Sequence, residues 1–408
     1  MARRRLDQVD AMRPVKQAGV VSTHSILVFA PAAATVGSGA ALLLLHVSRE
    51  GFFFISACML AYAYTDLNLT DRAGLGRYYR RRMVSVVIPY LCWTVIYFLY
   101  LLPTSHYRDV STALAHLAWT AEIGYYQLYF LLVIMQFYLV FPLVLALLRR
   151  TRGHHGLVLA AAAAAQLALA IATHWQLLPH LMQEYAQQNA LSYLLYLIGG
   201  SIVAFHLDEV HAWVTGHARL IIAATVAAGA AAEGIYFLAE AGVTTVLGSG
   251  SDAFQPSVIP FNVGAITCGY LAGVALVRPW RSRRAKTVVR VGADDAYGIY
   301  LSHMVFIIAL TWLGWGKLSS AVPWPLLCLL TVTIVFACSI TLTGLLARTP
   351  LAVPLTGRTQ VPWPKPRREI TKPSALSPPE MAGQAAAPDL SRPELAVLAA
   401  TVYQKDGT

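Results

Sequence analysis

Long runs of apolar residues, separated by short polar segments, repeat along most of this sequence. A helix needs ~20 mostly apolar residues to cross a bilayer, because the hydrocarbon core is ~30 Å thick and each residue adds ~1.5 Å. Runs of this kind lie near residues 14–34, 40–64, 84–102, 124–148, 157–175, 189–207, 219–239, 257–277, 294–314 and 323–347. The pattern therefore predicts an all-α fold, a polytopic transmembrane helix bundle of about ten spans.

Basic residues gather in alternate connections between these runs. Arginine-rich segments precede the first run and follow the second, fourth and eighth, whereas the opposite connections hold little more than Arg108 and Lys317. The segment after the sixth run is weaker, with Arg219 at its edge. Because basic loops remain in the cytoplasm, we expect both termini on the cytoplasmic side of a multi-pass plasma membrane protein.

The composition changes near Arg348. Proline and alanine become frequent and the long apolar runs stop, so this segment cannot bury enough apolar surface to offset its chain entropy. We therefore expect a transmembrane domain over residues 1–347 and a disordered Pro/Ala-rich cytoplasmic tail over residues 348–408.

The amino-acid composition supports the membrane interpretation. The chain is 57% hydrophobic and 12% charged, whereas soluble domains carry about 25% charged residues. The net charge of +11 comes from the basic connections, so it indicates membrane orientation and no nucleic-acid partner. The five cysteines lie in apolar runs without metal-ligand spacing, and we expect no metal site.

Ionisable side chains inside a membrane span are candidate functional residues, because burying them in hydrocarbon is costly. Arg13 and His24 are eleven residues apart, so they share one helix face, with His24 ~16 Å deeper than Arg13. Two interpretations are equally open. Arg13 can snorkel beside a structural His24, or the pair can line a polar site.

Two further groups share a helix face. His46 and Glu50 are one turn apart in the second run, which suits acid–base chemistry, although an ion pair between Arg49 and Glu50 is slightly favoured. Tyr300 and His303 are three residues apart in the ninth run, where a structural role is at least as well supported.

An arginine cluster follows the second run, with the sequence Arg77-Tyr78-Tyr79-Arg80-Arg81-Arg82. Arginine binds phosphate through paired N–H groups, and nearby aromatic rings can stack on a base, so the cluster could bind a phosphorylated cofactor. Membrane orientation with attraction to anionic lipid head groups is the other interpretation, and it alone explains most such clusters. The sequence has no Walker A loop, nucleophile elbow or dinucleotide fingerprint.

Several short segments follow one another in a fixed order: Arg13 with His24, Phe52–Ser56, Arg77–Arg82, Ile88–Tyr90 with Trp93, Gln127–Leu131, Phe137–Tyr138, Phe141–Pro142, Tyr196–Gly200 and Tyr297–His303. In this order and spacing, the chain resembles the acyltransferase 3 family of bacterial integral membrane O-acyltransferases. The resemblance extends from about residue 5 to residue 345.

The resemblance implies transfer of an acyl group, commonly acetyl, from cytoplasmic acyl-CoA to a hydroxyl of a cell-surface glycan, glycolipid or glycosylated metabolite. Acyl-CoA would be the donor substrate, with no resident cofactor. His24 would act as general base or acyl carrier, and Glu50 would orient or stabilise a histidine. The coenzyme A phosphates would be held by Arg13, Arg77, Arg80, Arg81 and Arg82.

Two other functions use the same buried polar residues. A lipid or glycan transporter would need them along its substrate path, and a non-catalytic membrane relative would keep them for structure. We find no inverted repeat of the kind that transporters often show. The sequence leaves the acceptor, the acyl chain, the oligomeric state and any partner protein open.

Overall fold

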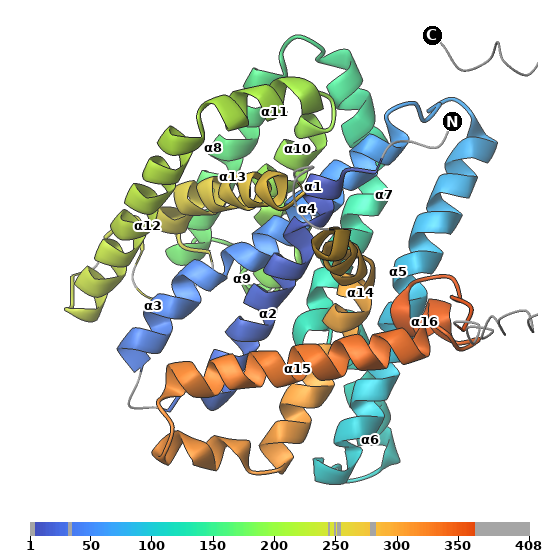
Figure 1. Ribbon diagram of the computed structural model, residues 1–408, viewed down its shortest axis with the longest axis vertical. Coiled ribbons are helices and arrows are strands. Elements are labelled where there is room, and N and C mark those ends of the chain that lie inside the picture. The colour runs from blue at the N-terminus through green and yellow to red at the C-terminus, as the bar shows by residue number, and fades with distance from the viewer. Residues whose placement is uncertain are drawn as a thin grey trace, which may run out of the picture. The chain divides into compact units, whose positions relative to one another are not determined.

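The computed structural model describes residues 5–31, 35–243, 245–248, 250, 254–277 and 283–363 (Figure 1). Within these residues the secondary structure is helical, apart from one isolated β-bridge between Thr245 and Gly248. The prediction of an all-α helix bundle is confirmed.

The helices follow one another in the order α1 (Asp7–Asp10), α2 (Met12–Phe29), α3 (Thr35–Leu45), α4 (Val47–Tyr64), α5 (Arg72–Leu101), α6 (Val110–Ile123), α7 (Tyr129–Arg150), α8 (His155–His174), α9 (His180–Glu184), α10 (Leu194–Val203), α11 (Leu207–Gly216), α12 (Ala218–Glu240), α13 (Ile259–Leu276), α14 (Arg283–Trp312), α15 (Trp324–Leu346) and α16 (Ala352–Thr356).

Every predicted apolar run coincides with a helix or a pair of helices. Seven helical segments of the described chain are long and apolar enough to cross a membrane, or eight if the pair α10 and α11, bent by 104°, counts as one span. Helices α2 and α14 are outside this set, because polar residues such as Arg13, Lys16 and Asp294 lower their hydropathy. The multi-pass character is confirmed, with seven or eight spans by these criteria instead of about ten.

Helices α2 and α4 lie at the centre of the packing. Helix α2 contacts α4, α14 and α15, and α4 packs most extensively against α10 (Figure 1). Gly200 of α10 makes this contact possible, because a side chain there would meet the backbone carbonyl of Phe54. Close approach of two helix backbones requires small residues of this kind.

The chain after α15 folds back onto the helices. The Trp93 indole N–H donates a hydrogen bond to the Leu355 carbonyl over 3.0 Å, and the Val361 amide donates one to the Ala347 carbonyl over 2.8 Å. Helix α16 packs against α5 and α14, with Thr356 buried. We call residues 348–362 the C-terminal strap.

The strap corrects the predicted domain boundary. Residues 348–362 belong to the compact part of the chain, instead of beginning a disordered tail at residue 348. The sequence prediction failed there because it weighed the frequent prolines more than the short apolar run before Gly357. The remainder of the predicted tail, residues 364–408, lies outside the described residues.

Candidate active site

A cavity of about 440 Å³ opens between α2, α4, α5, α7, α14 and the C-terminal strap. Three arginines from different parts of the chain line it, together with five aromatic residues. We call it the arginine cavity, and its most informative lining residues are Arg13, Arg82, Arg358, Phe52, Phe130, Tyr138, Tyr297 and Tyr300.

Arg13 and Arg82 bring two guanidinium groups to this cavity. Arg13 lies in the first turn of α2, next to Pro14, whose missing N–H costs little at a helix start. Its Nη1 is 3.6 Å from Asp10 Oδ1. Arg82 lies over the Tyr64 ring at 4.7 Å, and its Nε is buried without a hydrogen-bond partner in the described chain. Both groups therefore keep donors for an anionic ligand.

The other three arginines of the predicted phosphate site lie elsewhere. Arg77 is 73% exposed and pairs with Asp71 over 3.4 Å, and Arg80 and Arg81 are exposed on α5. Successive residues of a helix point ~100° apart, so the cluster cannot aim all its side chains at one cavity. Only Arg82 of the cluster lines the arginine cavity.

His24 and His303 form a ring contact between α2 and α14. Their ring centroids are 5.3 Å apart, at an interplanar angle of 41°. His303 Nδ1 is 2.7 Å from the Tyr300 carbonyl oxygen. A carbonyl can only accept, so Nδ1 donates its proton, and Nε2 of the neutral ring keeps its lone pair. That Nε2 is buried without a hydrogen-bond partner in the described chain.

Tyr300 connects the histidine pair to the arginine cavity. It lines the cavity, and its ring centroid is 6.1 Å from that of His303. Its hydroxyl donates a hydrogen bond to the Gln127 carbonyl, which fixes the phenol against the segment before α7. One aromatic ring therefore separates a cationic cavity from two imidazoles that can accept protons.

Glu50 lies apart from this arrangement. Its Oε1 accepts hydrogen bonds from Arg49 Nη2 and Nε over 2.5 and 3.1 Å. The Arg49 guanidinium in turn lies 4.9 Å from the centroids of the Tyr193 and Phe254 rings. The ion pair that the sequence slightly favoured is present, and Glu50 lines neither the arginine cavity nor the His24–His303 contact.

A small polar cavity lies beside Glu50. It measures about 10 Å³, and its lining includes Asn262 and Gln255. Oxygen atoms of all three side chains are buried without hydrogen-bond partners in the described chain. A space of ~10–15 Å³ holds about one water molecule, which suits a bridging water better than a substrate. His46, at the junction of α3 and α4, lines neither this cavity nor the arginine cavity.

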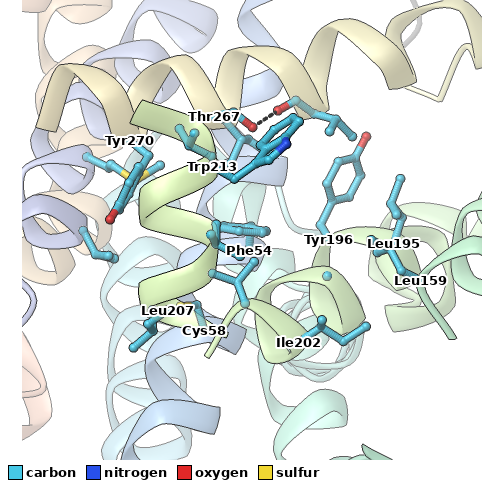
Figure 2. A pocket seen from close by; sticks show the side chains of 18 of the residues that line it. Phe54, Cys58, Leu159, Leu195, Tyr196, Ile202, Leu207, Trp213, Thr267 and Tyr270 are labelled. Atoms are coloured by element: carbon cyan, nitrogen blue, oxygen red, sulfur yellow. Dashed lines mark hydrogen bonds between the residues drawn. The ribbon is translucent and has the colours of Figure 1, made fainter. Parts of the chain in front are cut away.

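A third cavity, of about 460 Å³, has a different chemistry (Figure 2). We call it the apolar cavity, because its lining is almost entirely hydrocarbon, with Glu209, which pairs with His206, as its one charged residue in the described chain. It lies between α4, α8, α10, α11 and α13, where Phe54, Cys58 and Ile202 face Trp213 and Tyr270. A polyanionic substrate does not suit this lining.

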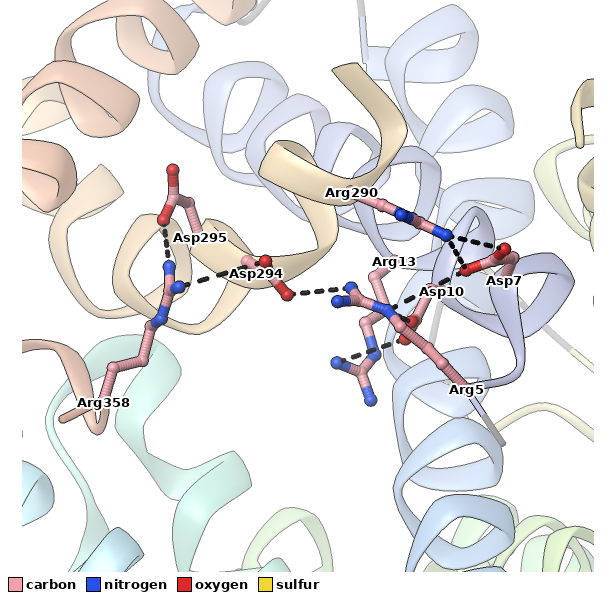
Figure 3. Close-up of polar contacts among 8 residues, drawn as sticks. All are labelled: Arg5, Asp7, Asp10, Arg13, Arg290, Asp294, Asp295 and Arg358. Atoms are coloured by element: carbon pink, nitrogen blue, oxygen red, sulfur yellow. Dashed lines mark hydrogen bonds and ion pairs between the residues drawn. The ribbon is translucent and has the colours of Figure 1, made fainter. Parts of the chain in front are cut away.

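An ion-pair network borders the arginine cavity (Figure 3). Arg358 of the strap pairs with Asp295 over 2.5 Å and with Asp294 over 3.9 Å. Asp294 also pairs with Arg5 over 2.8 Å. Among the described residues, Figure 3 draws this network with Arg5, Asp7, Asp10, Arg13, Arg290, Asp294, Asp295 and Arg358.

A family model for an acyltransferase domain, that of acyltransferase 3, matches residues 6–342 of this chain. The chain belongs to the acyltransferase 3 family. The match confirms the resemblance drawn from short sequence segments, and with the apolar helices it identifies a membrane acyltransferase. No curated protein and no solved structure matches the chain.

Besides Asp294, sequence reasoning missed a second charged residue that lines the arginine cavity, Arg358. It lies 16 residues beyond the family match, which ends at residue 342. The apolar run Leu351–Leu355 followed by Gly357 is the signal that could have found it, because glycine commonly ends a helix in the left-handed conformation. Gly357 has that conformation here, with φ of +66°.

Proposed function

We propose that this membrane acyltransferase transfers an acyl group, with acetyl as the expected group, from cytoplasmic acyl-CoA to a hydroxyl. The acceptor would be a cell-surface glycan, a glycolipid or a glycosylated metabolite. The observation that supports the proposal most is the arginine cavity, which ends at Tyr300 beside the His24–His303 contact.

The arginine cavity suits the donor. Coenzyme A carries several phosphate charges and a long, flexible arm that ends in the thioester. Arg13 and Arg82 would bind phosphates, because guanidinium groups form short, charge-assisted hydrogen bonds with them. The aromatic walls at Phe130 and Tyr138 would pack against the arm or the adenine. The volume of about 440 Å³ lies within the range of small-molecule sites.

The histidine pair suits the transfer step. A sugar hydroxyl is a weak nucleophile at neutral pH, so it needs a base within hydrogen-bond reach. In our proposal, a neutral ring nitrogen of His24 takes the hydroxyl proton while the oxygen attacks the thioester carbonyl. A C–O bond forms and the C–S bond breaks. The thiolate leaves and accepts a proton from His24, which regenerates the neutral imidazole and releases coenzyme A as the free thiol.

His303 would position His24 and keep the site polar. The hydrogen bond to the Tyr300 carbonyl fixes the His303 ring, so its unpaired Nε2 stays an acceptor. Glu50, which the sequence placed in the catalytic set, has Arg49 as its partner. That ion pair supports a structural role for Glu50 instead.

The proposal is tested with purified protein in vesicles, by measuring release of free thiol from acetyl-CoA with a soluble glycan acceptor. Acyl-CoA turnover that depends on the acceptor is the expected result, and mass spectrometry of the acceptor should show one added acyl group. Glycan movement across the vesicle membrane without thiol release would contradict the proposal and favour a transporter.

A further inference from the structure

The C-terminal strap forms one wall of the arginine cavity. Gly357 and Arg358 both line the cavity, and the hydrogen bond from Trp93 to Leu355 holds the strap just before them. A side chain at position 357 would collide with the Tyr297 ring, so the strap backbone lies directly on a cavity residue. The position of Arg358 is therefore set by packing on both sides.

The charges around the cavity leave room for an anion. Three cationic side chains line it, and Asp294 is the one carboxylate among its lining residues in the described chain. Asp295, which does not line the cavity, pairs with the Arg358 guanidinium over 2.5 Å. Figure 3 shows Arg358 on one side of Asp294, with Arg5 and Arg13 on the other. The Arg358 side chain is 31% exposed, so a ligand can reach it.

We propose that Arg358 is a further phosphate-binding residue for the donor, which the strap delivers from outside the family-matched domain. This inference rests on the proposed function. Asp295 orients the guanidinium fork before the donor binds, and a phosphate then competes with the carboxylate for the same N–H groups. The residue adds a third positive charge to the two that Arg13 and Arg82 supply.

Substitutions of Arg358 and of Asp295 should change the affinity for coenzyme A in different directions, which separates the roles of the two residues. We would measure binding of coenzyme A to the purified full-length protein by calorimetry. Arg358→Gln should weaken binding by about tenfold, the loss of one charge-assisted contact. Arg358→Lys, which keeps the charge but loses the fork, should lie between wild type and Arg358→Gln. Asp295→Asn should strengthen binding or leave it unchanged, because it removes the competitor. Arg150→Gln removes an equal charge from an exposed position at the end of α7, away from the arginine cavity, and should leave the affinity unchanged.

Each remaining outcome overturns a defined statement. Wild-type protein that does not bind coenzyme A would contradict the proposed function itself. Wild-type binding with equal affinity in Arg358→Gln would overturn only the role of Arg358. Equal weakening by Arg358→Gln and Asp295→Asn would show that the ion pair matters only for structure, and would overturn the inference as well.

The apolar cavity carries a second, independent inference. Leu159, Trp213 and Val263 line it and are also 37%, 57% and 45% exposed. They belong to α8, α11 and α13, which are candidate membrane spans or part of the bent pair. We therefore expect the exposed rim of the cavity to face lipid, where the surrounding medium is hydrocarbon and apolar spaces exclude water.

We infer that the apolar cavity holds one hydrocarbon chain of a membrane lipid. Its volume of about 460 Å³ is within the range of small-ligand sites. Phe54 and Cys58 of α4 face this cavity, whereas Phe52 and Ser56 face the arginine cavity. A hydrocarbon chain in the apolar cavity would therefore pack against α4, the same helix that forms one wall of the proposed donor site.

Photolabelling tests this inference. The protein would be reconstituted in phosphatidylcholine vesicles that contain a diazirine on the lipid chain, and adducts would be mapped by mass spectrometry. Cys58 is buried, so an adduct on Cys58 itself requires a hydrocarbon chain inside the cavity. Gly199→Leu should lower that labelling severalfold by filling the cavity, and Gly156→Leu, at an open position on α8, should not. Adducts confined to exposed residues such as Leu143 would overturn the inference.

Discussion

His303 shows how a single main-chain contact sets the chemistry of a side chain. The Tyr300 carbonyl accepts a hydrogen bond from the His303 Nδ1–H, so the neutral ring offers a lone pair at Nε2 next to His24. The Glu50 carboxylate, by contrast, is already paired with the neighbouring Arg49 guanidinium. Residue chemistry alone therefore does not define the site, because partners decide which groups remain available.

Both histidines should be needed for acyl transfer, for different reasons. His24→Ala should lower acyl transfer by about 10²–10⁴-fold, the usual contribution of a general base. His303→Asn keeps an N–H donor for the Tyr300 carbonyl but has no ring nitrogen, so it should fold and still lose activity. Thiol release from acetyl-CoA measures both effects. Full activity of a correctly inserted His24→Ala variant would remove His24 from the mechanism.

The Arg49–Glu50 pair should behave as a structural unit. Both side chains are nearly buried, with 10% and 3% exposure. Removing one partner of such a pair leaves an isolated charge and costs ~3–5 kcal/mol, whereas replacing both costs much less. Arg49→Met should therefore be strongly destabilised, and the double variant Arg49→Met with Glu50→Gln should recover. Thermal unfolding in detergent measures this. A stable double variant without acyl transfer would return Glu50 to the catalytic set.

At the scale of elements, the contact between α4 and α10 depends on one of two adjacent glycines. A Cβ at position 200 would meet the backbone of Phe54, which cannot move aside, whereas a Cβ at position 199 would meet only the end of the Leu159 side chain at 3.5 Å. Helix α10 therefore contacts the α4 backbone at Gly200, whereas at Gly199 it contacts only a flexible side chain of α8.

The two glycines should therefore differ in tolerance. Gly200→Ala should destabilise the protein by about 1–3 kcal/mol, the usual cost of overpacking, and Gly199→Ala should have little effect. Melting temperatures of the two variants in the same detergent provide the comparison, with each serving as the control for the other. Equal melting temperatures would mean that α10 can shift away from α4 without cost.

At the scale of the molecule, the orientation in the membrane decides which cavity acyl-CoA can enter. The basic connections predict that the start of α2 and the end of α7 lie in the cytoplasm, on the same side as the proposed phosphate site. The proposed transfer path then runs from the cytoplasmic end of α2 toward His24.

Cysteine accessibility tests this orientation. In a variant without the five native cysteines, Thr151→Cys should react with a membrane-impermeant maleimide only after the cells are opened. Ala241→Cys directly follows α12, on the outer side of the membrane in the predicted orientation, and should react in intact cells. The reverse pattern would place the arginine cavity on the outside and contradict a cytoplasmic donor.

Sequence periodicity predicted the helices well, because a run of apolar residues fixes a local helix through short-range spacing. The same spacing placed Arg13 and His24 on one face. The break at His46 between α3 and α4 and the 104° bend between α10 and α11 were not predicted. These features depend on which helices pack together, as does the contact of His24 with His303 from a distant part of the chain.

The strap also has a consequence for the order in which the protein is made. The wall that Gly357 and Arg358 contribute is synthesised after all the candidate membrane helices of the described residues. A nascent chain can therefore insert all these helices while one side of the arginine cavity is still missing. Completion of that wall therefore follows the synthesis of these helices, and a translation product interrupted before Gly357 would leave an incomplete pocket in the membrane.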